Sequence, residues 1–509
     1  MALFTVGCAS LRYDVPRVPS YAFDQPMLTR LGQSYVSQFA STPGQSGFHL
    51  LVSGSEAFAA RAALAESTER TLDLQYYSIT HGATSTLLMD SALRAARRGV
   101  RVRLLLDDLN VGARDVDLAM LAANSNVQVR LFNPFLRRGN FGIPRALEWL
   151  NDSDRLNRRM HNKLWIADGA VVVMGGRNLG DTYFDASPDG DFADLDVLAT
   201  GPVVAAVARS FDEYWNSGSA VPIESIVGPA PTSAAVERAR AEMAEQAARF
   251  RESDYAGALR EAAFGLLVRT GRVPLIVAPA EVLYDAPIEL YPDAGDRTSA
   301  IFPVLRRFVE KAQREVIMVS PYLVPGVPGV AALCSAIRRG IRVRILTNSL
   351  VSTDVPAVHA GYSRYRPELL ACGVELYELR PRRKSLQLAR PGLSSGASLH
   401  TKAMVVDGEV VFIGSMNLDP RSRFLNSEVA LQIESGELGR QLVNLFDEAT
   451  APDQVFRVGL DEAGNANSAL HWESIENGQP IRYTRDPLAS EWRRWLARLL
   501  GAFTPEAML

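Results

Sequence analysis

The chain has 509 residues, enough for two or more domains, and its 47% hydrophobic and 22% charged residues are the balance of an ordinary globular protein. A formal net charge of -3 lacks the basic excess of nucleic-acid-binding proteins and disfavours a nuclease. Three cysteines are too few and too scattered for a disulfide framework or a zinc site, and no apolar run is long enough to span a bilayer.

The N-terminal segment, 1–46, is rich in Pro, Ser and Gln, and we expect it to wrap the first domain as an extended arm. Its residues 3–10 contain a short apolar run followed by Cys8, which resembles the end of a bacterial lipoprotein signal. The run has no basic residue before it, is too short for a complete signal peptide and carries Thr5 at an unusual position. Lipidation of Cys8 and an accidental likeness both stay open.

Two stretches, 70–108 and 314–350, repeat the same pattern of predicted elements. Each consists of an apolar strand, an amphipathic helix that ends at Arg-Arg-Gly, and a second strand in which aliphatic residues alternate with Arg. Gly99 and Gly340 stand where a helix needs a left-handed residue to end. The pattern predicts a βαβ crossover with two neighbouring parallel strands in each copy.

A second repeated block follows in each copy, at 159–181 and at 398–420. His161 and His400 are 239 residues apart, close to the 241 residues between the two helix-ending glycines, so the chain is a tandem duplication. We therefore expect an α/β fold of two like domains, each a mixed sheet flanked by helices, related by a pseudo-twofold axis with one active site between them.

The predicted domain limits follow from the repeat. They are an N-terminal arm (1–46), a first domain (47–228), a helical connector rich in Ala, Glu and Arg (229–269), a second domain (270–450) and a C-terminal extension with an amphipathic helix (451–509).

Each block contains the motif His-x-Lys-x-x-x-x-Asp. In a strand, residues i and i+2 project from one face, so His and Lys point together into one cleft. An imidazole is a competent nucleophile or proton donor near pH 7, and a lysine neutralises a phosphate. Two histidines on opposite sides of one phosphorus supply in-line substitution, because one attacks while the other protonates the leaving oxygen. The candidate catalytic residues are His161, Lys163, Asp168, His400, Lys402 and Asp407.

The two motif aspartates carry a competing interpretation. Asp168 and Asp407 each precede Gly at a predicted turn, where Asp is favoured for hydrogen bonds to its own backbone. A structural role is the stronger interpretation for both.

Polar and small residues follow each motif at matching positions. Small residues let backbone N–H groups approach a phosphate, and an Asn amide can donate to its oxygens, so we expect Gly176, Asn178, Ser415 and Asn417 to bind substrate. Further along, DLDVLA places Asp196 where NSEVAL places Glu428. We expect each carboxylate to support the histidine of the other copy by holding one tautomer and stabilising its charged form.

With this duplicated motif the chain resembles the phospholipase D superfamily. The segments RLNRRMHNK, GGRNLGDTYF, SLHTK and IGSMNLDPRS make it similar to bacterial cardiolipin synthases, closest to the C-type members, from about residue 47 to the C-terminus. The resemblance implies a two-step phosphatidyl transfer without metal or cofactor. It implies phosphatidylglycerol as acceptor, phosphatidylglycerol or phosphatidylethanolamine as donor, His161 as nucleophile, and His400 as general acid and then base. The reverse assignment of the histidines stays open.

Three other functions compete with cardiolipin synthesis. Water in place of the acceptor alcohol would make the enzyme a hydrolase that releases phosphatidic acid. A metal-independent nuclease is less favoured because the charge is near neutral, and we expect no nucleic-acid partner. A non-catalytic lipid-binding protein is disfavoured by two intact motifs. The sequence does not indicate a protein partner.

Two segments are candidate membrane contacts. Residues 488–503 place large apolar side chains on one helical face and Arg493, Arg494 and Arg498 off it, which suits a helix lying in the membrane interface. A terminal helix docked on the core with its arginines in solvent fits equally well. Residues 132–149 form a second candidate contact or a packed loop. We expect a peripheral protein of the bacterial cell membrane, or one anchored through Cys8.

Overall fold

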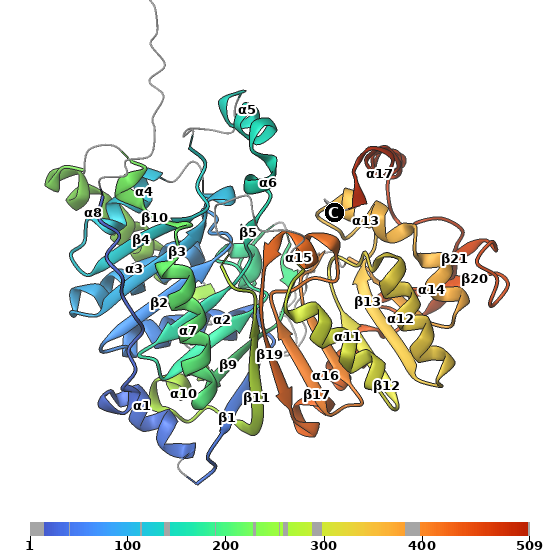
Figure 1. The fold of residues 1–509 in the computed structure, drawn as a ribbon, viewed down its shortest axis with the longest axis horizontal. Coiled ribbons are helices and arrows are strands. Elements are labelled where there is room, and N and C mark those ends of the chain that lie inside the picture. Colours follow the sequence, from blue (N-terminus) through green and yellow to red (C-terminus); the bar gives the residue numbers. More distant parts are fainter. Residues whose placement is uncertain are drawn as a thin grey trace, which may run out of the picture.

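The computed structural model describes residues 15–39, 41–111, 115–136, 143–188, 190–227, 231–253, 255–257, 263–287, 298–381 and 398–506. Cys8, with the lipidation expected there, lies outside them. The predicted α/β fold class is confirmed: helices flank a large mixed sheet in two similar halves (Figure 1).

The first half contributes the strand order β10–β4–β3–β2–β6–β7–β9–β1. Its strands are β1 (Gln45–Leu51), β2 (Thr71–Tyr76), β3 (Arg101–Asp107), β4 (Val127–Phe132), β6 (Leu164–Ala167), β7 (Val171–Gly175), β9 (Asp196–Thr200) and β10 (Ala220–Pro222). Its helices are α2 (Gly54–Ser67), α3 (Ala83–Arg97), α4 (Asp115–Ala122), α5 (Ile143–Asn151), α6 (Ser153–Leu156) and α7 (Pro202–Asn216).

The second half repeats the arrangement as β11–β19–β17–β16–β12–β13–β14 and adds β20–β21–β22 at its edge. The strands are β11 (Ile276–Tyr284), β12 (Glu315–Val319), β13 (Arg342–Asn348), β14 (Glu375–Leu379), β16 (Ala403–Val406), β17 (Val410–Gly414), β19 (Val429–Glu434), β20 (Val455–Leu460), β21 (Leu470–Glu476) and β22 (Gln479–Tyr483). The helices are α11 (Ile301–Lys311), α12 (Gly326–Arg338), α13 (Pro356–Ser363), α14 (Arg366–Ala371), α15 (Pro420–Phe424), α16 (Gly436–Ala449) and α17 (Glu491–Phe503).

The two halves join through equivalent strands. β1 borders β9 in the first half as β11 borders β19 in the second, and β1 and β11 pair antiparallel with Gln45 opposite Pro279 (Figure 1). Antiparallel pairing of equivalent strands is what a twofold relation requires. The pairings run in a single line from β10 to β22, so both halves share one continuous sheet.

The predicted βαβ crossovers are confirmed in both halves. β2 and β3 are parallel and connected by α3, and β12 and β13 are parallel and connected by α12. Gly99 and Gly340 adopt φ values of 96° and 85°, the left-handed conformation that ends a helix.

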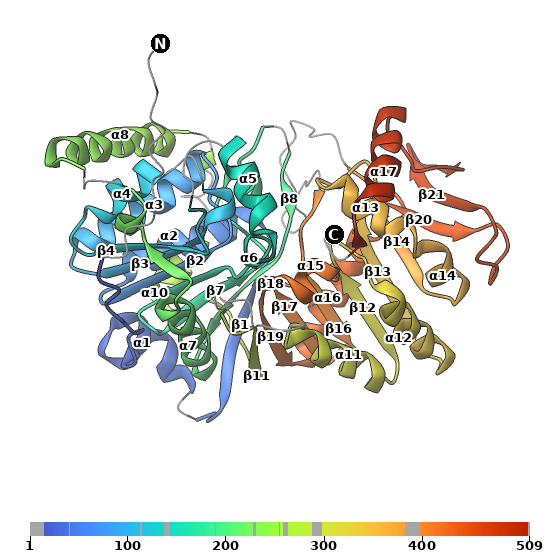
Figure 2. The ribbon, with the colours of Figure 1, turned by 45° about the horizontal axis from the view of Figure 1, so that its top comes forward.

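The core has an outer part in each half and a central part that both halves build. Phe211 and Trp215 of α7 and Leu442 and Phe446 of α16 all belong to this central core. The chain segment that connects the two halves contains α8 (Ser233–Arg251) and α10 (Phe264–Thr270). Both helices cover the outer side of the first half (Figure 2). The described start of the chain runs along α7, where the Ala22 N–H donates to Asp212 and Arg17 donates to the Gly218 carbonyl.

A disulfide joins Cys334 of α12 to Cys372, which follows α14. Their Cα atoms lie 5.5 Å apart although 38 positions separate them in the sequence. The cysteine count excluded a framework of bridges, and this isolated bridge depends on a proximity that only folding creates.

Candidate active site

Each candidate catalytic histidine lies where a short strand of one half pairs with a short strand of the other. β5 (Arg159–Met160) pairs with β18 (Asn426–Ser427), and β15 (Ser398–Leu399) pairs with β8 (Phe192–Ala193). The His161 N–H donates to the Ser427 carbonyl at 2.9 Å, and the His400 N–H donates to the Ala193 carbonyl at 2.7 Å. The structure thus brings both histidines to the junction of the halves.

A carboxylate from the opposite half holds each imidazole. Nδ1 of His161 lies 2.8 Å from Oε2 of Glu428, and Nδ1 of His400 lies 2.6 Å from Oδ2 of Asp194. With Nδ1 donating to a carboxylate, Nε2 is the nitrogen left to react with a substrate. Glu428 also accepts from the hydroxyls of Ser415 and Ser422, which fixes its orientation.

The prediction that Asp196 supports a histidine was wrong. Its carboxylate accepts from Arg61 at 2.8 Å, both side chains are fully buried, and the carboxylate that contacts His400 is that of Asp194. Asp194 takes the role instead. The prediction for Glu428 agrees with its contact to His161.

The error with Asp196 comes from a register that differs by two residues. Asp194 directly follows β8 as Glu428 directly follows β18. Gly175 lies opposite Asp196, whereas the equivalent Gly414 lies opposite Ala430, so Ala430 is the true counterpart of Asp196. A shift of two residues keeps the same strand face, and the pattern of side chains in the sequence therefore did not reveal it.

The electrostatics of the site favour a neutral His161. Burial lowers its pKa well below the ordinary value, and Lys163, Lys402 and His400 lower it further. This influence of His400 and both lysines on the pKa of His161 indicates that the four groups lie near one another. The two lysines also donate to the backbone carbonyl of the histidine in their own motif.

The other imidazole has a different environment. Burial lowers the pKa of His400 as well, but the facing Asp194 opposes that change. Burial alone would raise the pKa of Asp194, yet His400 outweighs it and keeps this carboxyl below its ordinary pKa. In contrast, burial raises the pKa of Glu428 to about 7. His400 therefore has the more strongly ionised partner and is the imidazole better suited to carry a proton.

The pKa values of the two lysines predict how the activity falls at basic pH. Burial lowers the pKa of Lys163 to about 7 and that of Lys402 to about 8. A lysine that loses its proton no longer neutralises a phosphate, so kcat/KM, which reports the free enzyme, is expected to fall as the pH rises above about 7, where Lys163 loses its proton first. Initial rates at subsaturating lipid across the pH range check this, and a profile that stays flat well above that pH would contradict it.

The aspartates of the two motifs lie at turns and not among the reacting groups. Asp168 and Asp407 have φ values of 53° and 56°, and each accepts three backbone N–H groups at the start of a neighbouring strand, β2 or β12. Their inclusion among catalytic candidates was wrong, and the structural interpretation holds, because these bonds occupy both oxygens of each carboxylate.

The small residues after the motifs, Gly176 and Ser415, have a structural role in place of the predicted contact with a phosphate. The N–H groups of Gly176 and Ser415 donate to the carbonyls of Leu195 and Val429, so they are not free for a phosphate. A Cβ on Gly176 would lie 2.1 Å from Oδ1 of Asp194, so only glycine allows that carboxylate to approach. The two positions shape the histidine–carboxylate pairs, and the prediction that they bind substrate was wrong.

The two asparagines differ from each other. Asn178 accepts from the Ser78 N–H and donates to the Tyr183 hydroxyl. Oδ1 of Asn417 is buried and has no hydrogen-bond partner among the described residues. Substrate binding by either amide stays a prediction.

Aromatic rings that the motif analysis missed surround the histidines. Tyr77 packs edge-on against His161 with ring centroids 4.9 Å apart, and Tyr183 and Phe192 pack against His400 at 5.3 Å and 5.1 Å. They restrict ring rotation and water access. Tyr183 lies within the segment GGRNLGDTYF, whose resemblance to the cardiolipin synthases could have marked it as a site residue. For Tyr77 the sequence contained no comparable indication.

One group of described residues has the composition of a metal site, namely His359, Glu378 and Asp486. Nη1 of Arg366 donates to Glu378 at 3.0 Å and to Asp486 at 2.9 Å. The guanidinium supplies the positive charge there, so the arrangement is an ion-pair network beneath α17.

Comparisons with known proteins agree with this geometry. Residues 62–215 and 305–450 match the family described as "Cardiolipin synthase, PLD-like domain", with one histidine motif in each segment. The chain is 39% identical to cardiolipin synthase C of Escherichia coli K12, over 95% of this chain and 100% of that protein. It is 31% identical to an uncharacterized protein of Helicobacter pylori 26695, over 97% of each. The phosphatidylserine synthase structure from Haemophilus influenzae Rd KW20 is similar in fold, with a TM-score of 0.58, 14% identity and coverage of 91% and 95%.

Proposed function

The chain belongs to the cardiolipin synthase, phospholipase D-like family, and from this premise we propose that it is a phosphatidyltransferase that forms cardiolipin through a phosphohistidine. Its substrates are phospholipids. We propose phosphatidylglycerol as the acceptor, and phosphatidylglycerol or phosphatidylethanolamine as the donor. The catalytic unit is the pair of domains 47–228 and 270–450.

In the first step Nε2 of His161 attacks the phosphorus of the donor lipid. The bond from phosphorus to the headgroup oxygen breaks, and that oxygen takes the proton from Nε2 of His400. Lys163 and Lys402 neutralise the phosphate oxygens, on which negative charge increases in the transition state.

In the second step the phosphatidyl group passes to the acceptor. Nε2 of His400, now neutral, removes the proton from the hydroxyl of phosphatidylglycerol, and the hydroxyl oxygen attacks the phosphorus. The bond between phosphorus and Nε2 of His161 breaks, which restores the neutral imidazole. The stronger ionisation of Asp194 supports this division of roles, since His400 must be protonated when the reaction begins.

One observation carries the proposal: two imidazoles with Nδ1 held by carboxylates from opposite halves, in one buried site with two lysines. The test is to incubate the purified protein with mixed vesicles of phosphatidylglycerol and phosphatidylethanolamine. Cardiolipin is the expected product. Phosphatidic acid without cardiolipin would show that water is the acceptor and that the enzyme is a hydrolase.

We further propose that the enzyme binds the membrane surface peripherally. Within the described part of the chain, helices long and apolar enough to cross a bilayer are absent. α17 instead exposes one apolar face, with Trp492 66%, Trp495 49% and Phe503 78% exposed, and the two Trp rings stack at 4.8 Å. Aromatic side chains of this kind favour the headgroup region of a bilayer.

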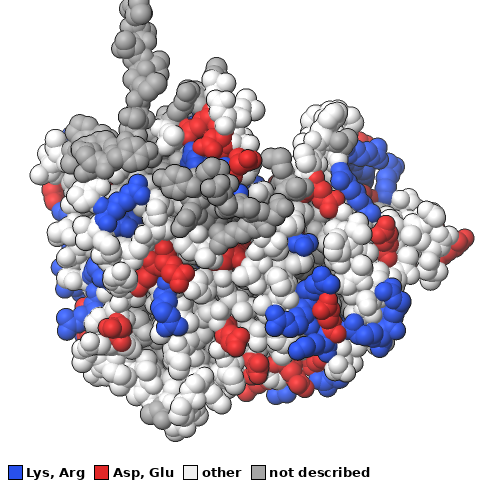
Figure 3. Space-filling view, viewed as in Figure 1, with Lys and Arg blue, Asp and Glu red and all other residues white. Residues whose placement is uncertain are grey.

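The contacts of α17 support a membrane-facing orientation over docking of its apolar face on the core. Arg493 donates to the carbonyls of Leu350 and Thr353, and Arg494 donates to Glu491 and to the Asp486 carbonyl. These arginines attach the helix to the second half, so its aromatic face turns outward. Figure 3 shows uncharged surface at the top of the molecule, where Figure 1 places α17, with basic side chains beside it.

The first half presents a matching surface. Leu147 and Leu150 of α5 are 45% and 76% exposed, and Leu136 nearby is 41% exposed. In both ribbon views α5 and α17 project on the same side of the molecule, one from each half, with α15 lying between and below them (Figures 1 and 2). Exposed apolar residues on these two helices, one in each half, would let lipid headgroups reach the site at the junction of the halves from the bilayer.

Replacing Trp492 and Trp495 together by Ala is expected to weaken vesicle binding at least tenfold while leaving the fold intact. Burying one large apolar side chain contributes about 1.5–3 kcal/mol, so two half-buried rings suffice for that change. Vesicle co-sedimentation measures it. The matched control is Leu266→Ala, an exposed apolar residue on α10 at the opposite end of the molecule. Equal binding by both variants would contradict the assigned surface.

A further inference from the structure

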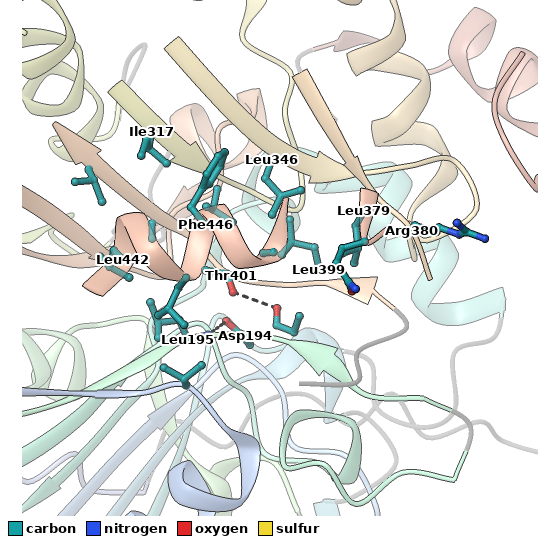
Figure 4. Close-up of a pocket in the computed structure, with 18 residues that line it drawn as sticks. Asp194, Leu195, Ile317, Leu346, Leu379, Arg380, Leu399, Thr401, Leu442 and Phe446 are labelled. Atoms are coloured by element: carbon teal, nitrogen blue, oxygen red, sulfur yellow. Dashed lines mark hydrogen bonds between the residues drawn. The ribbon is translucent and has the colours of Figure 1, made fainter. Parts of the chain in front are cut away.

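An apolar cavity, here called the slot, lies between α16 and the sheet of the second half. Its volume is about 140 Å³, similar to that of apolar protein cavities that bind small apolar molecules. Figure 4 shows mainly aliphatic side chains pointing into it. Its lining includes Ile317, Leu346, Leu379, Ala403, Leu442 and Ala449.

In the first half, larger side chains occupy the space that is equivalent to the slot. Phe211 of α7 lies under Arg103, and Asp212 accepts from the same arginine; in the second half Phe446 and Asp447 make these two contacts with Arg344. The matching contacts align α7 with α16 residue by residue. Two positions after Asp447 stands Ala449, where the first half has Tyr214.

Two further positions carry a smaller residue in the second half. Phe132, opposite Asp107 in the first half, corresponds to Leu379, opposite Asn348, and Leu164 at the start of β6 corresponds to Ala403 at the start of β16. In the first half the rings of Phe132 and Tyr214 pack 5.7 Å apart and are almost fully buried. The slot exists because its three counterparts are smaller.

An empty apolar cavity of this size destabilises a fold, because the atoms around it lose packing contacts, and such cavities bind apolar ligands. All three exchanges remove volume and none introduces a charge. The pattern therefore favours an aliphatic occupant over a packing defect.

The slot also adjoins the active site and has a route to solvent. Asp194, which holds His400, contributes to its wall. At the end marked by Val52 and Leu445 it meets a surface groove lined in part by acidic side chains of α16, Glu437 and Glu448. Arg380 lines the slot at the end labelled in Figure 4. The guanidinium of Arg380 is paired with Glu476 and donates to the Ile475 carbonyl, so its charge is compensated, and the acidic groove disfavours an anionic headgroup at the other end.

We propose that the slot binds an aliphatic chain of a phospholipid. The proposal rests on the phospholipid specificity proposed above, because an acyl chain of phosphatidylglycerol is the occupant that this activity would supply. A free fatty acid shares the same chemistry. The bound chain packs against Asp194 and so supports the carboxylate that positions His400.

The test is photo-crosslinking with two probes, a phosphatidylglycerol and a free fatty acid, each with a diazirine in its chain. It uses the His161→Ala protein, so that labelling does not depend on turnover or on the proposed reaction. The expected adducts lie on 317–319, 346 and 442–449. Ala403→Leu and Ala449→Tyr restore the larger side chains of the first half and should reduce these adducts at least tenfold. Ala244→Leu, a similar change on an exposed position of α8, should leave them unchanged.

Each outcome decides the proposal. Adducts from the phosphatidylglycerol probe support a phospholipid chain, and adducts from the fatty acid probe alone support the slot with a free amphiphile as its source. Failure of both probes to label the slot, or labelling that persists in both filled variants, overturns the proposal. If circular dichroism shows that a filled variant is misfolded, the adduct map of the other residues decides, and adducts only outside the slot overturn the proposal.

Discussion

The His161→Ala protein is expected to form no phosphohistidine and to lose cardiolipin synthesis by a factor of about 10³–10⁴, the contribution of a positioned nucleophile and its proton transfers. His161 is the neutral imidazole of the pair, and its Nε2 faces the substrate because Nδ1 is bound to Glu428. Quenched reactions with phosphorus-labelled lipid measure both quantities, as label retained on the protein and as labelled cardiolipin.

His400→Ala separates the two roles. A donor lipid with a leaving group that needs no proton, such as a nitrophenol ester, should still label this variant, and the label should accumulate because the base for the second step is missing. The matched control is His49→Ala, whose ring stacks on Phe264 outside both motifs, and it should behave like the wild type. Label on the His161→Ala protein would reverse the nucleophile assignment.

The second prediction distinguishes two buried aspartates only two residues apart. Asp194→Asn is expected to lower kcat by about 10²- to 10⁴-fold, because an amide neither stabilises a charged imidazole nor selects its tautomer. The free energy of unfolding should change little. Rates at saturating lipid and urea denaturation measure the two effects.

Asp196→Ala should produce the opposite result. It leaves Arg61 fully buried without its partner, and breaking such a pair costs about 3–5 kcal/mol of folding free energy. The fraction of protein that still folds should turn over at nearly the normal rate. If instead Asp196→Ala removes activity without loss of stability, the assignment of Asp194 as the positioning carboxylate is wrong.

Residues that depend on local pattern were predicted well from the sequence. The alternation of strand residues and the helix-ending glycines Gly99 and Gly340 were visible in both copies, and the structure has the corresponding crossovers. The paired motifs identified His161 and His400 as the candidate reacting residues, because a tandem repeat keeps equivalent side chains at equivalent positions of the fold. The turn position of Asp168 and Asp407 could also be predicted, because local hydrogen bonds favour aspartate before glycine in a turn.

Residues whose role depends on a distant partner were predicted less well. Gly176 and Ser415 looked suited to a phosphate, but their N–H groups bond to neighbouring strands. For α17 the sequence pattern fitted a helix docked by its apolar face and a helix with that face turned outward equally well. The partners of Arg493, at Leu350 and Thr353, lie more than a hundred residues away and attach the helix by its basic side.

The sequence alone determined the duplication, the α/β class and the two histidine–lysine motifs, because periodicity and repetition are properties of a linear string. The tertiary structure decided which carboxylate serves which histidine, since β5 pairs with β18 and β15 with β8 across the junction of the halves. It also opened the slot, where three smaller side chains meet from β14, β16 and α16. Both features depend on distances between segments far apart in the chain, and such distances exist only after folding.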